Sequence, residues 1–386
     1  MNLQKIQQAL REHDVDGWLL YDFHNRDPIA MHILGLDPEK FSSRRWYYFI
    51  PTEGEPVKLV SKVEATVLDF LPGKKAPYLS WKEMHRKIKE TLGSRKRIAM
   101  NYSTSMVDGG TVELIKSFGY ELVSAADLIQ QFEAVLDDSQ IATHAHAGEI
   151  VLKIKDEAFA KIGKAVSEGR EVTEYEIQQF IMKRFEEEGL TCDGHGPIVG
   201  VNEHPANPHF EPTAENARVF KKGDTILIDL WARKDEPGSI YYDVTWCAYA
   251  GDNPPDKYKE IFQTVCNARD AAKNLVEEKF ASGEACYGWE VDDVCRNVIK
   301  EAGYGDYFIH RTGHSIGTEV HGNGVNIDNL ETKDERRLIP GVCFSIEPGI
   351  YLEGEMAVRT EINICITPDG QVKVFGDIQQ DLILLD

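Results

Sequence analysis

Two acidic hairpin motifs in the C-terminal half constrain the fold of this chain more than any other feature of its sequence. In the first motif, Asp229 ends the apolar run 225–228, and Asp243 begins a second apolar run. Residues 233–239 between them are rich in turn formers, a pattern typical of a β-hairpin. A hairpin centred near Glu236 would place the two aspartates directly opposite each other.

The second motif repeats this design with glutamates. Glu347 follows the strand-like residues 344–346, Glu361 lies within the run 358–362, and Gly354 is the midpoint between the two glutamates. A single Asp at a strand end is usually a turn residue, and a single Glu before Pro is usually on the surface. Two symmetric hairpins favour a shared function instead. Opposed like charges roughly 4.5–5.5 Å apart destabilise a hairpin, so the two carboxylate pairs call for a bound cation.

A histidine between the two motifs completes a set of metal ligands. In chain order the set indicates a two-metal hydrolytic site: Asp229, Asp243, His314, Glu347 and Glu361, the five ligand candidates. Four carboxylates and one imidazole suit Mn²⁺, with Co²⁺, Fe²⁺ or Zn²⁺ as alternatives set by availability. Two such ions roughly 3.5–4 Å apart lower the pKa of a shared water and polarise a carbonyl, which supplies a hydroxide nucleophile near neutral pH.

The composition is that of an ordinary globular protein, and it excludes several classes of partner. The chain has 386 residues, 42% hydrophobic and 28% charged, so two domains are the default expectation. Its formal charge of −21 argues against binding to nucleic acid or to anionic membranes. We find no apolar signal-peptide stretch and no apolar run of about 18–20 residues. Seven cysteines without a Cys-x-x-Cys motif predict reduced thiols in a cytoplasmic protein.

Residues 1–135 alternate strand and helix patterns and predict an N-terminal mixed α/β domain without a catalytic cluster. We expect helices over 3–12 and 112–118, and strands over 17–21, 45–50, 57–60 and 97–100.

A second domain is expected over residues 140–386, linked to the first by a helical stretch over 134–149. A capping box at Thr173 opens the second of four further predicted helices, which cover 150–166, 174–188, 255–279 and 291–302. Each pair of helices is followed by one acidic hairpin. This order suggests an internal duplication in which each half contributes one acidic pair.

Four segments around these residues resemble one known family. Residues 310–321 resemble its His-x-x-Gly-His segment with a trailing histidine, and 346–351 and 358–361 match its two glutamate motifs. Residues 197–209 resemble its upstream histidine segment. The family is the creatinase/aminopeptidase P/prolidase family of metallopeptidases (M24), and the resemblance covers essentially the whole chain. It implies an α/β (α+β) protein: an N-terminal creatinase-like domain, then a C-terminal pita-bread domain of two pseudo-twofold-related halves.

The resemblance also implies a role for each ligand candidate. Asp243 and Glu361 would bridge the two ions. Asp229 would complete the shell of one ion, and His314 and Glu347 that of the other. Glu347 would also be the proton shuttle beside the attacking water.

Five further residues belong to the predicted site. His209 and His321 match family positions that contact the substrate carbonyl and the developing tetrahedral centre; the alternative for each is a structural histidine. His310 either supports the ligands or has a structural role. Tyr351 either supports them or lines the pocket, and Arg359 orients the carboxylates.

The resemblance implies a homodimeric exopeptidase that hydrolyses the bond before proline in short peptides. Dipeptidases of this family commonly carry an arginine four residues after the trailing histidine, where it holds the substrate carboxylate; here that residue is Val325. This favours the aminopeptidase P type over an Xaa-Pro dipeptidase (prolidase), unless another arginine, such as Arg44 or Arg45 of a neighbouring subunit, takes the role. The remaining alternatives are a lyase or C–N hydrolase acting on a non-peptide, and a non-catalytic peptide-binding protein.

Overall fold

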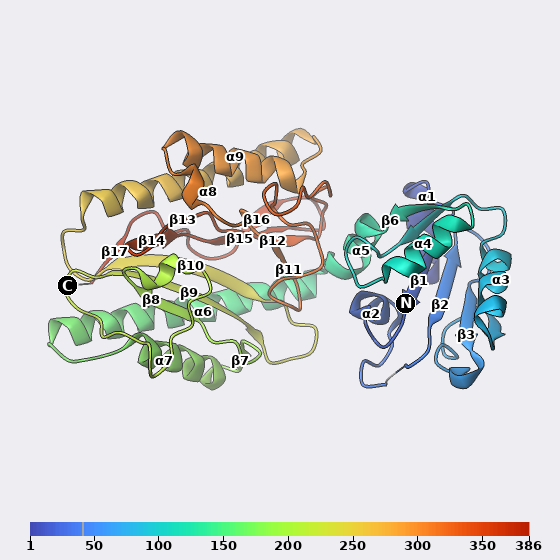
Figure 1. The fold of residues 1–386 in the computed structure, drawn as a ribbon. Coiled ribbons are helices and arrows are strands. Elements are labelled where there is room, and N and C mark those ends of the chain that lie inside the picture. The colour runs from blue at the N-terminus through green and yellow to red at the C-terminus, as the bar shows by residue number, and fades with distance from the viewer. Residues whose placement is uncertain (41, 386) are drawn as a thin grey trace. The chain divides into compact units, whose positions relative to one another are not determined.

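The computed structural model describes residues 1–40 and 42–385 and divides the chain into two compact units (Figure 1). Unit 1 covers Met1–Glu133, and unit 2 covers Ala134–Asp386. Both combine helices with sheets, which confirms the expected mixed α/β class. Within the described residues, no helix has both the length and the apolar character needed to cross a membrane.

Unit 1 is built on a six-stranded sheet with the strand order β4-β3-β2-β1-β5-β6. The predicted helices and strands are confirmed, and five further elements join them. In chain order the elements are α1 (Leu3–Glu12), β1 (Gly17–Asp22), α2 (Pro28–Leu34), β2 (Trp46–Pro51), β3 (Val57–Ser61), β4 (Lys74–Tyr78), α3 (Trp81–Leu92), β5 (Arg97–Met100), α4 (Gly109–Ser117), β6 (Glu121–Ser124) and α5 (Ala126–Ile129).

The central strands of unit 1 are buried on both faces of the sheet. Every residue of β1 and β2 is buried, and the two strands pair antiparallel. Trp18 and Leu20 pack with α1, α2 and α5, whereas Leu19 and Tyr21 pack with α3 and α4. Helices on both faces explain why these strands are continuous apolar runs in the sequence rather than alternating ones.

The first half of unit 2 places a helix pair against a sheet. Asp137 and Gln140 form a capping box that opens the first helix, and Thr173 with Glu176 forms the predicted one that opens the second. The first helix runs unbroken through both the predicted link and the predicted helix after it. The elements are α6 (Asp138–Ser167), α7 (Glu174–Glu187), β7 (Leu190–Thr191), β8 (Ile198–Val201), β9 (Thr225–Lys234) and β10 (Tyr242–Tyr249), with β17 (Ile383–Leu384) beside β10.

The second half of unit 2 again places a helix pair against strands. A four-stranded sheet has the order β11-β12-β15-β16, and β13 and β14 form a separate ribbon. The elements are α8 (Asp256–Ser282), α9 (Gly288–Glu301), β11 (Ser315–Ile316), β12 (Cys343–Ile346), β13 (Gly349–Leu352), β14 (Met356–Arg359), β15 (Ile362–Ile366) and β16 (Val372–Val374).

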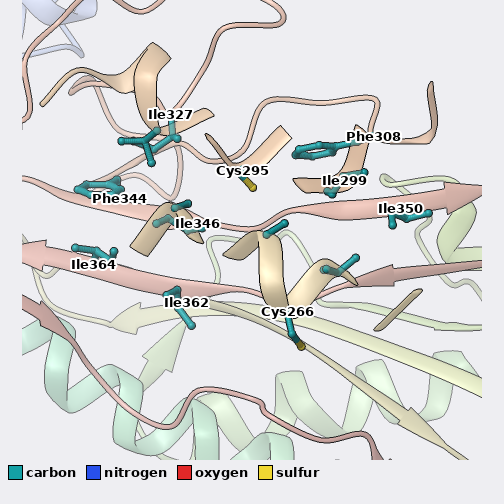
Figure 2. Packing of buried hydrophobic residues seen from close by; sticks show 14 of the residues in the cluster. Cys266, Cys295, Ile299, Phe308, Ile327, Phe344, Ile346, Ile350, Ile362 and Ile364 are labelled. Carbon is teal, nitrogen blue, oxygen red and sulfur yellow. The ribbon is translucent and has the colours of Figure 1, made fainter. Parts of the chain in front are cut away.

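Strand alternation decides which side chains of unit 2 face the space between its halves. In the first half, Ile226, Ile228 and Leu230 pack with α6 and α7, so Asp229 points to the opposite face of its sheet. In the second half, Ile346 and Ile362 point into the core that contains residues of α8 and α9 (Figure 2). Their neighbours Glu347 and Glu361 therefore point the other way. Both halves thus turn their acidic residues toward each other.

Gly313 allows the chain before His314 to approach β12. A Cβ at this position would lie 2.0 Å from the carbonyl oxygen of Ser345. The backbone of Gly313 also exchanges hydrogen bonds with Ile327, at 3.2 and 3.0 Å, so the segment is held from its other side. Only a residue without a side chain fits between these two partners.

We therefore expect Gly313→Ala to lower the free energy of unfolding by about 1–3 kcal/mol, because the clash is with backbone that cannot rotate away. Gly109→Ala is the control, since a Cβ at Gly109 meets nothing within 4 Å. Thermal unfolding followed by circular dichroism measures both variants. Equal melting temperatures for the two would show that the Gly313 segment relaxes without cost.

Candidate metal centre and active site

The first acidic hairpin is real, but its register differs from the predicted one. Asp229 lies opposite Thr245, and Asp243 lies opposite Trp231. The predicted direct opposition of the two aspartates is therefore wrong. The turn is centred on Pro237 rather than Glu236, because β9 continues through residues that the sequence pattern had assigned to the turn. The two aspartates are diagonal neighbours on one face, a separation of about 7–8 Å between Cα atoms that side chains still span.

The second acidic hairpin has the predicted register. Ile346 pairs with Ile362 on one side of the glutamates, and Gly349 pairs with Arg359 on the other. Both pairs have the same midpoint, so Glu347 and Glu361 lie opposite each other between the two ladders. The turn has Gly354 at its centre with a φ of 72°, a backbone conformation that glycine adopts without strain.

The two hairpins and His314 meet in one buried cluster. Ligand atoms of Asp243, His314 and Glu361 lie within 4.8 Å of one another. The Nε2 atom of His314 is 3.6 Å from Asp243 Oδ2 and 3.3 Å from Glu347 Oε1. Asp229 joins the cluster through Arg359, whose guanidinium also lies near Glu347. The structure therefore brings all five ligand candidates together.

Three carboxylate oxygens in this cluster lack a hydrogen-bond donor. They are Asp229 Oδ1, Asp243 Oδ1 and Glu361 Oε1, each buried and without a partner among the described residues. A buried carboxylate oxygen without a donor or a cation is costly, and native proteins rarely leave one. Divalent ions would satisfy all three oxygens, so the donor set fits the predicted metals.

The pKa values of the carboxylates in this cluster also indicate that it binds cations. Burial raises the pKa values of Asp229, Asp243 and Glu361 above their ordinary range, and the neighbouring carboxylates add to the rise. For Glu347, burial also acts to raise the pKa, but nearby His314, His310 and Arg359 outweigh it and hold the pKa below its usual value. Without a cation, this much buried negative charge would have to be relieved by protons.

Hydrogen bonds orient the imidazole of His314. Its Nδ1 lies 3.1 Å from the carbonyl oxygen of Ser315, which only accepts, so Nδ1 donates and Nε2 keeps its lone pair toward the carboxylates. The backbone N–H of His314 donates to Ser345 Oγ at 2.9 Å, and that hydroxyl donates to Glu347 Oε1 at 3.1 Å. Such outer contacts fix the tautomer and direction of a metal-binding histidine.

His310, Tyr351 and Arg359 form a chain of hydrogen bonds that ends on Asp229. His310 donates from Nδ1 to a carbonyl at 2.7 Å, so its Nε2 accepts from the Tyr351 hydroxyl at 2.7 Å. That hydroxyl accepts from Arg359 at 2.8 Å, and Arg359 donates to Asp229 and, at 3.0 Å, to the hydroxyl of Thr245. Among the ligand candidates, this chain of hydrogen bonds directly reaches Asp229, and the roles expected for His310 and Tyr351 stay predictions.

A cavity of about 750 Å³ opens onto the cluster, and its lining includes His209 and His321 as well as four of the five ligand candidates. The rings of His314 and His321 meet edge to face with centroids 4.2 Å apart. Desolvation in the cavity, together with the nearby charge of His314, lowers the pKa of His321 to about 4. His321 is therefore neutral at pH 7, with one N–H available to donate.

Some cavity residues were not predicted from the sequence. Trp231 and Tyr241 line the cavity, and each lies two residues from an aspartate ligand candidate. The period-two alternation of a strand would have found them, because residues i and i+2 share a face. Arg311 also lines the cavity, but it lies in a loop, where no periodic pattern predicts the direction of a side chain.

Comparisons with known proteins agree with this geometry. Residues 145–368 match the sequence model of metallopeptidase family M24. The whole chain is 27% identical to the Xaa-Pro dipeptidase of Lactobacillus delbrueckii subsp. lactis and covers 99% of it. The putative dipeptidase YkvY of Bacillus subtilis is 31% identical over 69% of this chain and 67% of its own length. The crystal structure of dipeptidase PepE from Mycobacterium ulcerans has the same fold, with a TM-score of 0.72 at 22% identity over 99% of this chain and 96% of that one.

We expect Asp243→Asn to lower metal content and kcat/KM by more than about 100-fold, because the change removes a charged ligand from the centre of the cluster. The metal-free variant should melt no lower than the metal-free wild type, since it relieves repulsion among buried carboxylates. Elemental analysis, kinetics and thermal unfolding measure the three effects. Asp252→Asn, an exposed residue of the same unit, is the control. Full turnover of Asp243→Asn at saturating Mn²⁺ would contradict the ligand role.

His321→Ala should lower kcat and kcat/KM by a similar factor, about 100-fold or more, and leave the bound metal unchanged. The reason is that a neutral N–H aimed at the reacting carbonyl matters most in the transition state. Steady-state kinetics and metal analysis of the same preparation test this. A rise in KM alone would make His321 a ground-state contact, and loss of metal would make it a support for His314.

Proposed function

Because the chain belongs to metallopeptidase family M24, we propose that it is a metal-dependent Xaa-Pro dipeptidase, a prolidase. One observation carries the proposal: a single cavity is lined by four of the five ligand candidates together with His209, His321 and Arg311. Of the curated relatives reported above, one is named an Xaa-Pro dipeptidase and matches the full length of this chain, and the other is named a putative dipeptidase. Short proline-containing peptides are the proposed substrates. A homodimer and a cytoplasmic location stay predictions from the sequence.

The five ligand candidates would hold two divalent ions, with Mn²⁺ the first to test. When bound, such ions supply Lewis-acid activation of a carbonyl and of a water nucleophile. We assign proton transfer and substrate binding to side chains of the protein. Glu347, whose Oε1 accepts from Ser345, is placed to take a proton from the nucleophile and pass it to the leaving proline nitrogen.

The histidines of the cavity would act on the peptide itself. His321 donates its N–H to the oxygen on which negative charge develops, and His209 faces the same space from a different segment of the chain. Ile198, Pro208 and Trp231 give the cavity an apolar wall on which a proline ring can pack. These contacts bind and orient the peptide and exclude water from it.

Val325 does not favour an aminopeptidase P, because it lies in the core and not in the cavity. Val325 is 1% exposed and belongs to the hydrophobic core together with residues of α8 and α9. The valine side chain does not line the cavity. The absence of an arginine at this position therefore says nothing about the length of the peptide, and the prolidase alternative is the better supported one.

Arg311 is the residue we assign to the substrate carboxylate. Its side chain lines the cavity near His321, and its guanidinium forms no ion pair or hydrogen bond with any described residue. An unpaired guanidinium in a site offers the bidentate, charge-assisted contact that a free carboxylate needs. Arg311 therefore does in this chain what the arginine absent from position 325 does in some relatives.

We expect the wild type to cleave an Xaa-Pro dipeptide at least 10-fold more efficiently than the matching Xaa-Pro-Xaa tripeptide or the C-terminal amide. Arg311→Ala should lower kcat/KM for the dipeptide roughly 10- to 100-fold, because it removes one charge-assisted contact, and should leave kcat/KM for the amide unchanged. Lys333→Ala removes a cation of the same unit that does not line the cavity and is the control.

Two outcomes of these assays would count against the proposal. Faster cleavage of the tripeptide by the wild type would make the protein an aminopeptidase P. An equal loss on dipeptide and amide in Arg311→Ala would show that Arg311 does not hold the carboxylate.

A further inference from the structure

A second group of metal-ligating side chains lies in unit 2, away from the active site. It consists of His144 in α6, Cys343 in β12 and Cys365 in β15, called here the thiol–imidazole cluster. One ligand atom from each residue lies within 4.8 Å of the other two, and all three side chains are buried. No other cysteine among the described residues belongs to a group of three possible ligands.

The histidine of this cluster is fixed in the tautomer that binds a metal. His144 Nδ1 lies 2.5 Å from the backbone carbonyl of Tyr241, and a carbonyl only accepts, so Nδ1 carries a proton. The lone pair of Nε2 is left to face Cys343 Sγ, 3.9 Å away. Metal-binding histidines commonly donate their other ring N–H to a backbone carbonyl in this way.

The two thiols come from directly opposed strand positions. Cys343 pairs with Cys365 in the antiparallel ladder of β12 and β15, the same ladder in which Ile346 pairs with Ile362. Around them pack Leu136, Ile141 and Ile316, and the rings of Tyr242 and Phe375 cover the imidazole at 5.1 and 5.5 Å. The surroundings therefore offer soft ligands in an apolar shell, unlike the oxygen-rich active centre.

Cys343 and His144 share one proton, and Cys365 holds another of its own. Burial acts to raise the pKa of Cys343, but hydrogen bonds from Cys365 and His144 outweigh it and bring the pKa to about 6. Cys365 keeps its proton, because burial and the neighbouring thiol raise its pKa. The Cys343–His144 pair therefore holds one proton that a cation can displace, and Cys365 holds a second.

We propose that His144, Cys343 and Cys365 bind one thiophilic divalent cation, Zn²⁺ in the cell, at a site separate from the active centre. Binding releases two protons, one from Cys365 and one shared by Cys343 and His144, and forms two metal–sulfur bonds and one metal–nitrogen bond. Two thiolates neutralise the divalent charge, so the apolar core receives no net charge. Soft thiolate ligands select such an ion over Mn²⁺.

The bound cation would tie the two halves of unit 2 together behind the active site. His144 belongs to the first half, and the two cysteines belong to strands of the second half. Cys343 precedes Glu347 by four residues, and Cys365 follows Glu361 by four. The cation therefore pins the strands that present both glutamates, at a distance of about 13 Å along the ladder.

Binding of Co²⁺ at the thiol–imidazole cluster can be detected by absorption spectroscopy, without an activity assay. Thiolate ligands give Co²⁺ an intense near-ultraviolet charge-transfer band, and the active centre, which has only oxygen and nitrogen ligands, cannot produce it. The protein is expressed in minimal medium with added Co²⁺, so that the ion is present while the chain folds. We expect the band in the wild type and one more cobalt per chain than in Cys343→Ser or Cys365→Ser, both of which should lack the band.

Cys295→Ser is the matched control, because Cys295 is equally buried but lies outside the thiol–imidazole cluster. It should keep the band, and circular dichroism verifies that each variant folds. Absence of the band from soluble wild-type protein would overturn the proposal, whatever the variants do. So would fewer than seven free thiols in the metal-free, denatured protein, since oxidation of Cys343 and Cys365 would leave five of the seven cysteines.

Discussion

The mutual repulsion of four buried carboxylates is the constraint on which unit 2 depends. Asp229 and Asp243 come from one half and Glu347 and Glu361 from the other, and both pairs point into the same buried space. The guanidinium of Arg359 pairs with Asp229 and offsets one negative charge. The imidazole of His314, which lies beside Glu347, offsets part of the remaining negative charge. The fold holds the carboxylates in place through backbone contacts across the halves, such as Glu361 N–H to the Thr245 carbonyl at 3.1 Å. The remaining charge is what makes this space a metal centre.

The sequence was sufficient to predict which five side chains meet in one cluster but not every detail of their placement. The second hairpin could be predicted in register because Gly354 alone marks its turn. The first could not, because β9 extends through polar residues as far as Lys234, and strand pairing there outweighs a composition that favours a turn. The error does not separate the two aspartates. Moving the turn centre by one residue shifts the strand pairing by two positions, so both aspartates stay on one face of the sheet.

Residues that act from loops were harder to predict than residues on strands. Val325 stands at a position that carries an arginine in some relatives, yet in this chain its side chain packs in the core. Spacing along a chain transfers between relatives, but the direction of a side chain outside a strand or helix depends on contacts that no pattern records. For Arg311 the opposite holds. Its position in the sequence predicts no role, but in the structure its side chain lines the cavity.

The division of the ligands between two half-domains has a consequence for how this unit comes apart. Neither half contains a complete set of ligand candidates, so separating the halves dismantles the centre. The bound ions therefore contribute to cooperativity rather than only to total stability. With the ions bound, the two halves should unfold in a single transition. Without the ions, only protein contacts join the halves, such as those of Leu227 and Cys247 in the core that contains α8 and α9, and unfolding should become less cooperative.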